Sequence, residues 1–293
     1  MSLEAVDLLL TDSCKKEPCP WCISVRKDEE EVPFKANGQK RVNWLRLIGL
    51  FPSLGINRVI CSGGEPRKLG PKFYELINTA AQNNMYVTVS TAIFPQEGDE
   101  LLTSMQQSKK ILVGLPLDGS TPEMCGLMRG EGEGNRFASN LHGLKVLQGL
   151  DLLDRVTLRT VVARPNFSNV LEIPAMLLNN GIELFKLRWK LYQVNPLGVH
   201  KDEYDKWLIH TLDFMRIISR LKDIKEMGEI TTLPVLAADR HHLIINSQGN
   251  ANMVEMEGWL KEWPDIPSLR YRRLGNVNNE GMEQIIQRFR GIR

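Results

Sequence analysis

The feature that most constrains the fold of this chain is a repeated alternation of short apolar segments with amphipathic helical patterns. Six runs rich in β-branched residues occur before residue 200, and a helical pattern follows each of the first five. Such alternation predicts parallel strands joined by right-handed crossovers, and therefore an α/β fold. The fold would be a barrel or a doubly wound sheet, with functional groups at the C-terminal ends of strands. The expected strands span residues 5–11, 57–62, 85–91, 110–118, 155–163 and 183–194.

The pattern changes near residue 200, so we expect two parts. Residues 1–200 would form the α/β unit, with helices over 43–55, 72–84, 97–108, 136–149 and 170–181. Residues 201–293 would form a C-terminal extension that caps it. In this extension we expect one long amphipathic helix over 202–224, a hairpin over 241–256 that turns at SQGN, and a helix over 280–290.

The composition narrows the classes of partner. The 293 residues are 42% apolar and 25% charged, as in ordinary globular proteins, and the formal net charge is only +2. This charge gives no electrostatic case for nucleic acid or a membrane as the main partner. No apolar run approaches the roughly 20 residues that span a bilayer. Glu4 and Asp7 stand where a signal peptide would carry basic residues, so we expect a cytoplasmic protein.

Three of the five cysteines lie within nine residues, in the segment CKKEPCPWC that follows the first expected strand. These are Cys14, Cys19 and Cys22. Thiols stay reduced in the cytoplasm, so a cluster of them is more typical of metal ligands or catalysts than of disulfides.

A zinc site usually takes four protein ligands arranged as two pairs, and the rest of the chain offers no second pair. Cys61 and Cys125 each stand alone, and His241 and His242 are adjacent, so only one of them could readily turn toward a shared metal. Three thiolates without a fourth ligand better suit an iron–sulfur cluster with one iron left open.

At this point the chain resembles the radical SAM superfamily. Its members carry a loop CxxxCxΦC, with Φ aromatic, after the first strand of a partial (βα)6 TIM-like barrel. Cys19, Trp21 and Cys22 match CxΦC, whereas Cys14 and Cys19 enclose four residues rather than three. The resemblance implies that Cys14, Cys19 and Cys22 ligate a [4Fe–4S] cluster, with Trp21 beside the cofactors.

A second motif follows the second strand, where NRVICSGGEP resembles the GGEP motif of the same superfamily. The resemblance implies that Gly63, Gly64 and Glu65 hold the amino group of S-adenosylmethionine (SAM). Consecutive glycines let a backbone approach a ligand closely. Taken alone, the motif is also explained as a strand-to-helix turn.

A third motif, LPLDGSTPEMCGLMRG, resembles the superfamily pattern SLDGxTPExHDxxRG after the fourth strand. It implies that Arg129 pairs with the SAM carboxylate, for which a guanidinium fork is well suited. A surface salt bridge at a helix start is the alternative. Pro116 replaces a serine of the pattern and Cys125 a histidine; we interpret Cys125 as a small buried residue.

Weaker matches fall at three further strand ends. By resemblance, Ser90 would reach the ribose of SAM, Asn166 would lie near the adenosine, and Gln193 would flank the adenine. Ordinary turn and strand-end chemistry explains the same residue types.

The resemblance covers residues 8–198 and implies a radical SAM enzyme. The cluster would reductively cleave SAM to a 5′-deoxyadenosyl radical, which takes hydrogen from a substrate in oxidoreductase- or lyase-type chemistry. It also implies a flavodoxin- or ferredoxin-type electron donor. The tail has no cysteine, so we expect a single cluster. We favour a small-molecule substrate that undergoes rearrangement or carbon–carbon bond formation. Modification of a peptide is the alternative, and a non-enzymatic zinc- or cluster-binding regulator is the alternative from another class.

Overall fold

The computed structural model describes residues 5–11, 13–14, 19–22, 42–130, 134–199, 201–233 and 243–291. His241 and His242 lie outside these ranges. The strands form one ten-stranded sheet in the order β10-β9-β8-β1-β2-β3-β4-β5-β6-β7. Their bounds are β1 Ala5–Thr11, β2 Arg58–Gly63, β3 Tyr86–Ser90, β4 Ile111–Pro116, β5 Val156–Val162, β6 Arg188–Gln193, β7 Ile230–Leu233, β8 Leu243–Asn246, β9 Asn250–Leu260 and β10 Trp263–Asn276.

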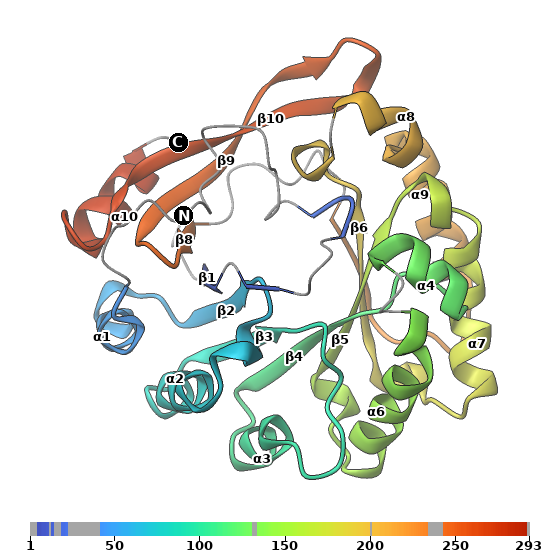
Figure 1. Ribbon diagram of the computed structural model, residues 1–293, viewed down its shortest axis with the longest axis horizontal. Coiled ribbons are helices and arrows are strands. Elements are labelled where there is room, and N and C mark those ends of the chain that lie inside the picture. The colour runs from blue at the N-terminus through green and yellow to red at the C-terminus, as the bar shows by residue number, and fades with distance from the viewer. Residues whose placement is uncertain are drawn as a thin grey trace.

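The first six strands form the predicted partial barrel. Each of β1 to β6 pairs in parallel with its neighbour, and the sheet is not closed. Figure 1 shows this curved sheet with helices along its outer side. The fold class is therefore confirmed, and the C-terminal ends of all six strands lie at one edge.

Most of the helices between these strands begin and end close to the predicted positions, but the helix Pro122–Arg129 was not predicted. Their bounds are α1 Trp44–Leu50, α2 Pro71–Gln82, α3 Glu100–Gln107, α4 Pro122–Arg129, α6 Phe137–Gly149 and α7 Ile173–Asn179. Among the described residues, no helix is both long enough and apolar enough to cross a membrane.

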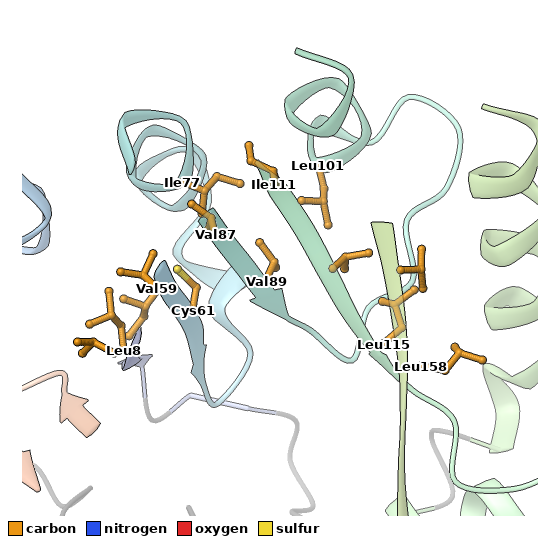
Figure 2. Packing of buried hydrophobic residues seen from close by; sticks show 14 of the residues in the cluster. Leu8, Val59, Cys61, Ile77, Val87, Val89, Leu101, Ile111, Leu115 and Leu158 are labelled. Carbon is orange, nitrogen blue, oxygen red and sulfur yellow. The ribbon is translucent and has the colours of Figure 1, made fainter. Parts of the chain in front are cut away.

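Alternation along the strands separates a core face from an inner face. On β5, Val156 and Leu158 are buried in the main apolar cluster, whereas Thr157 and Arg159 are only half-buried on the opposite side. Figure 2 shows the core side of neighbouring strands, where Cys61 lies among apolar residues. The inner face of β5 therefore carries Thr157 and Arg159.

The tail departs from the prediction in two respects. The predicted single helix over 202–224 is wrong, because the chain forms a short α8 (Tyr204–Trp207) and then α9 (Thr211–Lys222). The strands β7 and β10 were not predicted. The hairpin is confirmed as β8 and β9, and the last helix as α10 (Met282–Gly291).

These tail strands continue the barrel sheet at both of its edges. β7 pairs in parallel with β6, and β8 pairs in parallel with β1. The domain boundary near residue 200 stays a prediction.

Candidate functional site

The three clustered cysteines follow β1 at the C-terminal edge of the sheet. Cys14, Cys19 and Cys22 are half-buried, and the Cys22 N–H donates to the Cys19 carbonyl at 2.9 Å, which makes a tight turn. Residues 15–18 lie outside the described ranges. Within those ranges, no group of three or more His, Cys, Asp and Glu side chains is placed to hold a metal ion. Three thiols are suitable ligands for an iron–sulfur cluster that is bound by three cysteines. Their ligation of such a cluster stays a prediction.

The glycine pair at the end of β2 lies directly against the strand that leads into the cysteines. The Gly64 N–H donates to the Thr11 carbonyl at 2.6 Å, and the Glu65 N–H donates to the Ser13 carbonyl at 2.7 Å. Gly63 has a φ of 112°, and a Cβ there would lie 2.5 Å from the Thr11 carbonyl oxygen. Only glycine allows this approach.

The Glu65 carboxylate joins the ends of β2 and β3. It is buried and accepts hydrogen bonds from the Thr91 hydroxyl at 2.7 Å, the Ala92 N–H at 2.8 Å and the Arg67 N–H at 3.2 Å. A carboxylate has about four acceptor positions, so these donors use most of its capacity. Glu65 therefore has a structural role, and its contact with an amino group stays a prediction.

Arg129, in the last turn of α4, forms an ion pair in the interior rather than at the surface. Its Nη1 lies 2.9 Å from Oδ2 of Asp118, a residue with no exposed surface. The other oxygen of Asp118 accepts from the Val161 N–H at 2.7 Å. Asp118 therefore fixes α4 to β5 and orients the guanidinium of Arg129. The alternative of a surface salt bridge does not describe this buried pair.

The aromatic residue of the cysteine loop packs onto the end of the same helix. The Trp21 indole N–H donates to the Met128 carbonyl at 2.8 Å, and the Arg129 guanidinium lies 5.4 Å from the Trp21 ring centroid. Trp21 also packs against an apolar cluster that includes Trp207 of α8 and Trp263 of β10. The first and third motifs, more than a hundred residues apart, are thus in direct contact.

The side chains of the three weaker candidates, Ser90, Asn166 and Gln193, form hydrogen bonds with other residues of the chain. Asn166 is buried; its Oδ1 accepts from the Ala163 N–H, and its Nδ2 donates to the carbonyls of Asp118 and Val161. Ser90 accepts a hydrogen bond from Arg159.

Gln193 lies at the end of β6, opposite Val162 of β5. Its Nε2 donates to the Ile209 carbonyl at 2.9 Å, which ties β6 to the segment before α9. Its side chain is on the buried, helix-facing side of β6. Contact of Ser90, Asn166 and Gln193 with SAM stays a prediction.

The sequence analysis did not name two further residues that lie near this site. Arg159 and Lys190 occupy inner-face positions of β5 and β6 and are register partners. The period-two alternation of these strands carried the signal, because both residues alternate with buried ones.

Comparisons with known proteins identify the fold. No protein-family model and no curated protein sequence matches the chain. Among solved structures, Streptococcus suis SuiB bound to S-adenosylmethionine is 13% identical, with a TM-score of 0.64, over 85% of this chain and 60% of SuiB. Native anSMEcpe with bound AdoMet and Kp18Cys peptide is 16% identical, with a TM-score of 0.67, over 97% of this chain and 80% of that one. The chain has their fold.

The likeness to anSMEcpe extends over both parts of this chain, since 97% of the chain is covered. SuiB has also been solved bound to its precursor peptide SuiA, with a TM-score of 0.65 and 13% identity over 85% of this chain. The chain spans 59% of SuiB in that structure. At these identities the likeness concerns the fold, and activity is argued below from the chain's own residues.

Proposed function

We propose that this chain is a radical SAM enzyme. One observation carries the proposal: three motifs far apart in sequence are joined at one edge of the sheet. The Glu65 N–H bonds to Ser13 beside the cysteine loop, and Trp21 of that loop bonds to Met128 beside Arg129. Parallel strands bring all of these turns to one edge, so the support comes from the direct hydrogen bonds between the motifs. The solved structures of the same fold that hold SAM give independent support.

Cys14, Cys19 and Cys22 would hold the cluster as three thiolates. When bound, a [4Fe–4S] cluster with one open iron supplies the electron that cleaves SAM. The proposal requires the loop to draw its three sulfurs together around the cluster. Thiolates gathered without a cation repel one another, so this arrangement depends on the cluster being present.

The remaining motif residues would position SAM. The tight approach of Gly63 to Thr11 places the backbone of the glycine pair next to the cysteine loop. Asp118 orients the guanidinium of Arg129, and we propose that this guanidinium also meets the SAM carboxylate. The Trp21 ring covers one side of Arg129 and helps to exclude water.

The substrate is a small molecule in our primary proposal, with a flavodoxin- or ferredoxin-type protein as electron donor. A peptide is the second candidate, because structures of the same fold hold peptides: SuiB with SuiA and anSMEcpe with Kp18Cys. Incubating the reconstituted enzyme with metabolite pools and with candidate peptides, followed by mass spectrometry, separates the two.

Anaerobic reconstitution with iron and sulfide tests the proposal. We expect iron and sulfide in equal amounts, about four of each per chain, and reductive conversion of SAM to methionine and 5′-deoxyadenosine. Alanine variants of Cys14, Cys19 and Cys22 should each lose the cluster. Cys61→Ala is the matched control, because its thiol is buried on the helix-facing side of β2, and it should keep both cluster and cleavage.

The alternative of a metal-binding regulator makes a different prediction. Zinc without iron or sulfide, in protein handled anaerobically throughout, would favour the regulator and contradict the enzyme. A cluster that is assembled normally but never cleaves SAM would also contradict the enzyme.

A further inference from the structure

The inner face of the barrel carries two basic residues side by side. Arg159 on β5 and Lys190 on β6 are register partners, and both are half-buried. Their strand neighbours Leu158 and Trp189 are buried on the opposite, helix-facing side. The two cationic groups therefore face the interior of the open barrel, away from the apolar core.

Arg159 lies flat across the neighbouring strand. A Cβ on Gly114 of β4 would fall well inside contact distance of the guanidinium carbon, and 2.7 Å from Nη2. The guanidinium reaches past Gly114 to β3, where Nη1 donates to the Ser90 hydroxyl. Gly114 therefore provides the space for this side chain, and Ser90 fixes its end.

The hydrogen bonding of Arg159 is incomplete. Its Nε–H is buried and has no hydrogen-bond partner within the described part of the chain. A buried donor without an acceptor costs about 1–3 kcal/mol. An acceptor that reaches this group would remove that cost.

The charges of the pair are also uncompensated within the described ranges, where neither residue forms an ion pair with a carboxylate. Arg159 bonds to the neutral Ser90 hydroxyl, and the Lys190 ammonium lies 5.1 Å from the Tyr192 ring centroid. Two neighbouring half-buried cations without an anion repel each other. A carboxylate or phosphate would relieve this repulsion and match the planar donor fork of arginine.

The pair also lies deeper in the barrel than Arg129. The Val161 N–H, two residues after Arg159 on β5, holds the carboxylate of Asp118, which in turn holds Arg129. A substrate anchored at Arg159 and Lys190 would therefore extend from the barrel interior toward the edge where the three motifs meet.

We propose that Arg159 and Lys190 bind a carboxylate or phosphate group of the substrate, with Gly114 and Ser90 as positioning residues. The substrate is thus an anionic compound. The inference rests on the proposed function for what the bound compound undergoes. It also gives Ser90 a role in orienting Arg159.

The test measures binding rather than turnover, so it is independent of SAM cleavage. Inorganic phosphate and acetate are titrated separately into the reconstituted protein by calorimetry, and SAM affinity is measured in parallel. We expect saturable binding of at least one anion. Arg159→Gln and Lys190→Gln should each weaken it by about tenfold or more, with SAM affinity changed less than about twofold. Preference for phosphate or for acetate identifies the group.

Two further variants keep the test decisive. Gly114→Ala keeps both charges but displaces the guanidinium, so it should weaken anion binding as Arg159→Gln does. Arg188→Gln, on the same strand at an exposed position paired with Glu229, is the matched control and should bind like the parent.

Anion binding that is absent, or unchanged in Arg159→Gln, overturns the proposal. An equal loss of SAM affinity in that variant also overturns it, because the pair would then serve the carboxylate of SAM. Normal anion binding in a protein that does not cleave SAM would contradict the proposed function while leaving the anion site intact.

Discussion

Replacing Gly63 by alanine tests the contact that joins the glycine pair to the cysteine loop. The φ of 112° at this position strains a residue that has a Cβ, at a cost of about 1–2 kcal/mol. The new Cβ would lie 2.5 Å from the Thr11 carbonyl oxygen, where ordinary contact begins near 3.4 Å. The Thr11 carbonyl belongs to the backbone and a Cβ is held rigidly by its own backbone, so no flexible side chain can relieve the overlap.

Relief requires β1 and β2 to separate at their ends. This movement would break the 2.6 Å hydrogen bond from the Gly64 N–H to the Thr11 carbonyl, which is worth about 1 kcal/mol. The free energy of unfolding should therefore fall by roughly 2–3 kcal/mol in all. Because Thr11 leads directly into the cysteine loop, the variant should also retain less iron after reconstitution.

Urea denaturation followed by circular dichroism measures the change. The control is Gly49→Ala in α1, where a Cβ meets nothing within 4 Å and alanine should stabilise the helix by up to about 1 kcal/mol. If Gly63→Ala unfolds at the same urea concentration as the parent, the close approach is not made and the reasoning fails.

Four further predictions concern Cys61, Trp21 and Asp118. Burial and, secondarily, Asp7 raise the pKa of the Cys61 thiol from the ordinary 9 to about 12. In the folded, metal-free protein at pH 8, iodoacetamide should therefore alkylate the half-buried thiols and leave Cys61 unmodified. Peptide mass spectrometry measures this difference. Between pH 9 and 12 the folded protein keeps this proton and the unfolded chain loses it, so the contribution of Cys61 to stability should decline across that range, and a pH series in which Cys61→Ala gives the same slope as the parent would contradict this. Trp21→Phe removes the donor to Met128, worth about 1 kcal/mol, and a chelator should extract iron about fivefold faster; an unchanged rate would show that the bond does not restrain the loop. Asp118→Asn leaves Arg129 without its buried partner and should cost about 3 kcal/mol in urea denaturation, while adding Arg129→Gln should cost less than the sum of the two single changes; additive costs would rule out the coupling.

Local patterns were sufficient to predict the barrel and the motif positions. Along the strands of the barrel, residues that become buried alternate with more exposed ones, and this pattern is visible in the sequence. The turn at position 63 requires glycine, which the sequence has there. The identity of the cysteine loop likewise rests on residues close together in the chain.

The errors arise from contacts between distant residues. At the interruption between α8 and α9, Oδ2 of Asp265 on β10 accepts a hydrogen bond from the Thr211 N–H at 2.7 Å. Its Oδ1 lies 2.8 Å from Nδ1 of His210. β10 itself contains two prolines and an arginine-rich run, and it forms as the antiparallel partner of β9. Neither feature can be read from a local window.

The same limit applies to the inner face of the barrel. The sequence alternation places Arg159 and Lys190 on that face, but it does not reveal that Arg159 lies across Gly114 or that Ser90 holds it. Those contacts depend on the register of three neighbouring strands.

Electron paramagnetic resonance of the reduced, reconstituted protein, recorded with and without SAM, tests the central claim most directly. If three thiolates leave one iron open for SAM beside the joined motifs, adding SAM should change the spectrum of the reduced cluster, and Cys61→Ala should behave identically. A reduced cluster whose spectrum is the same with and without saturating SAM would contradict the account.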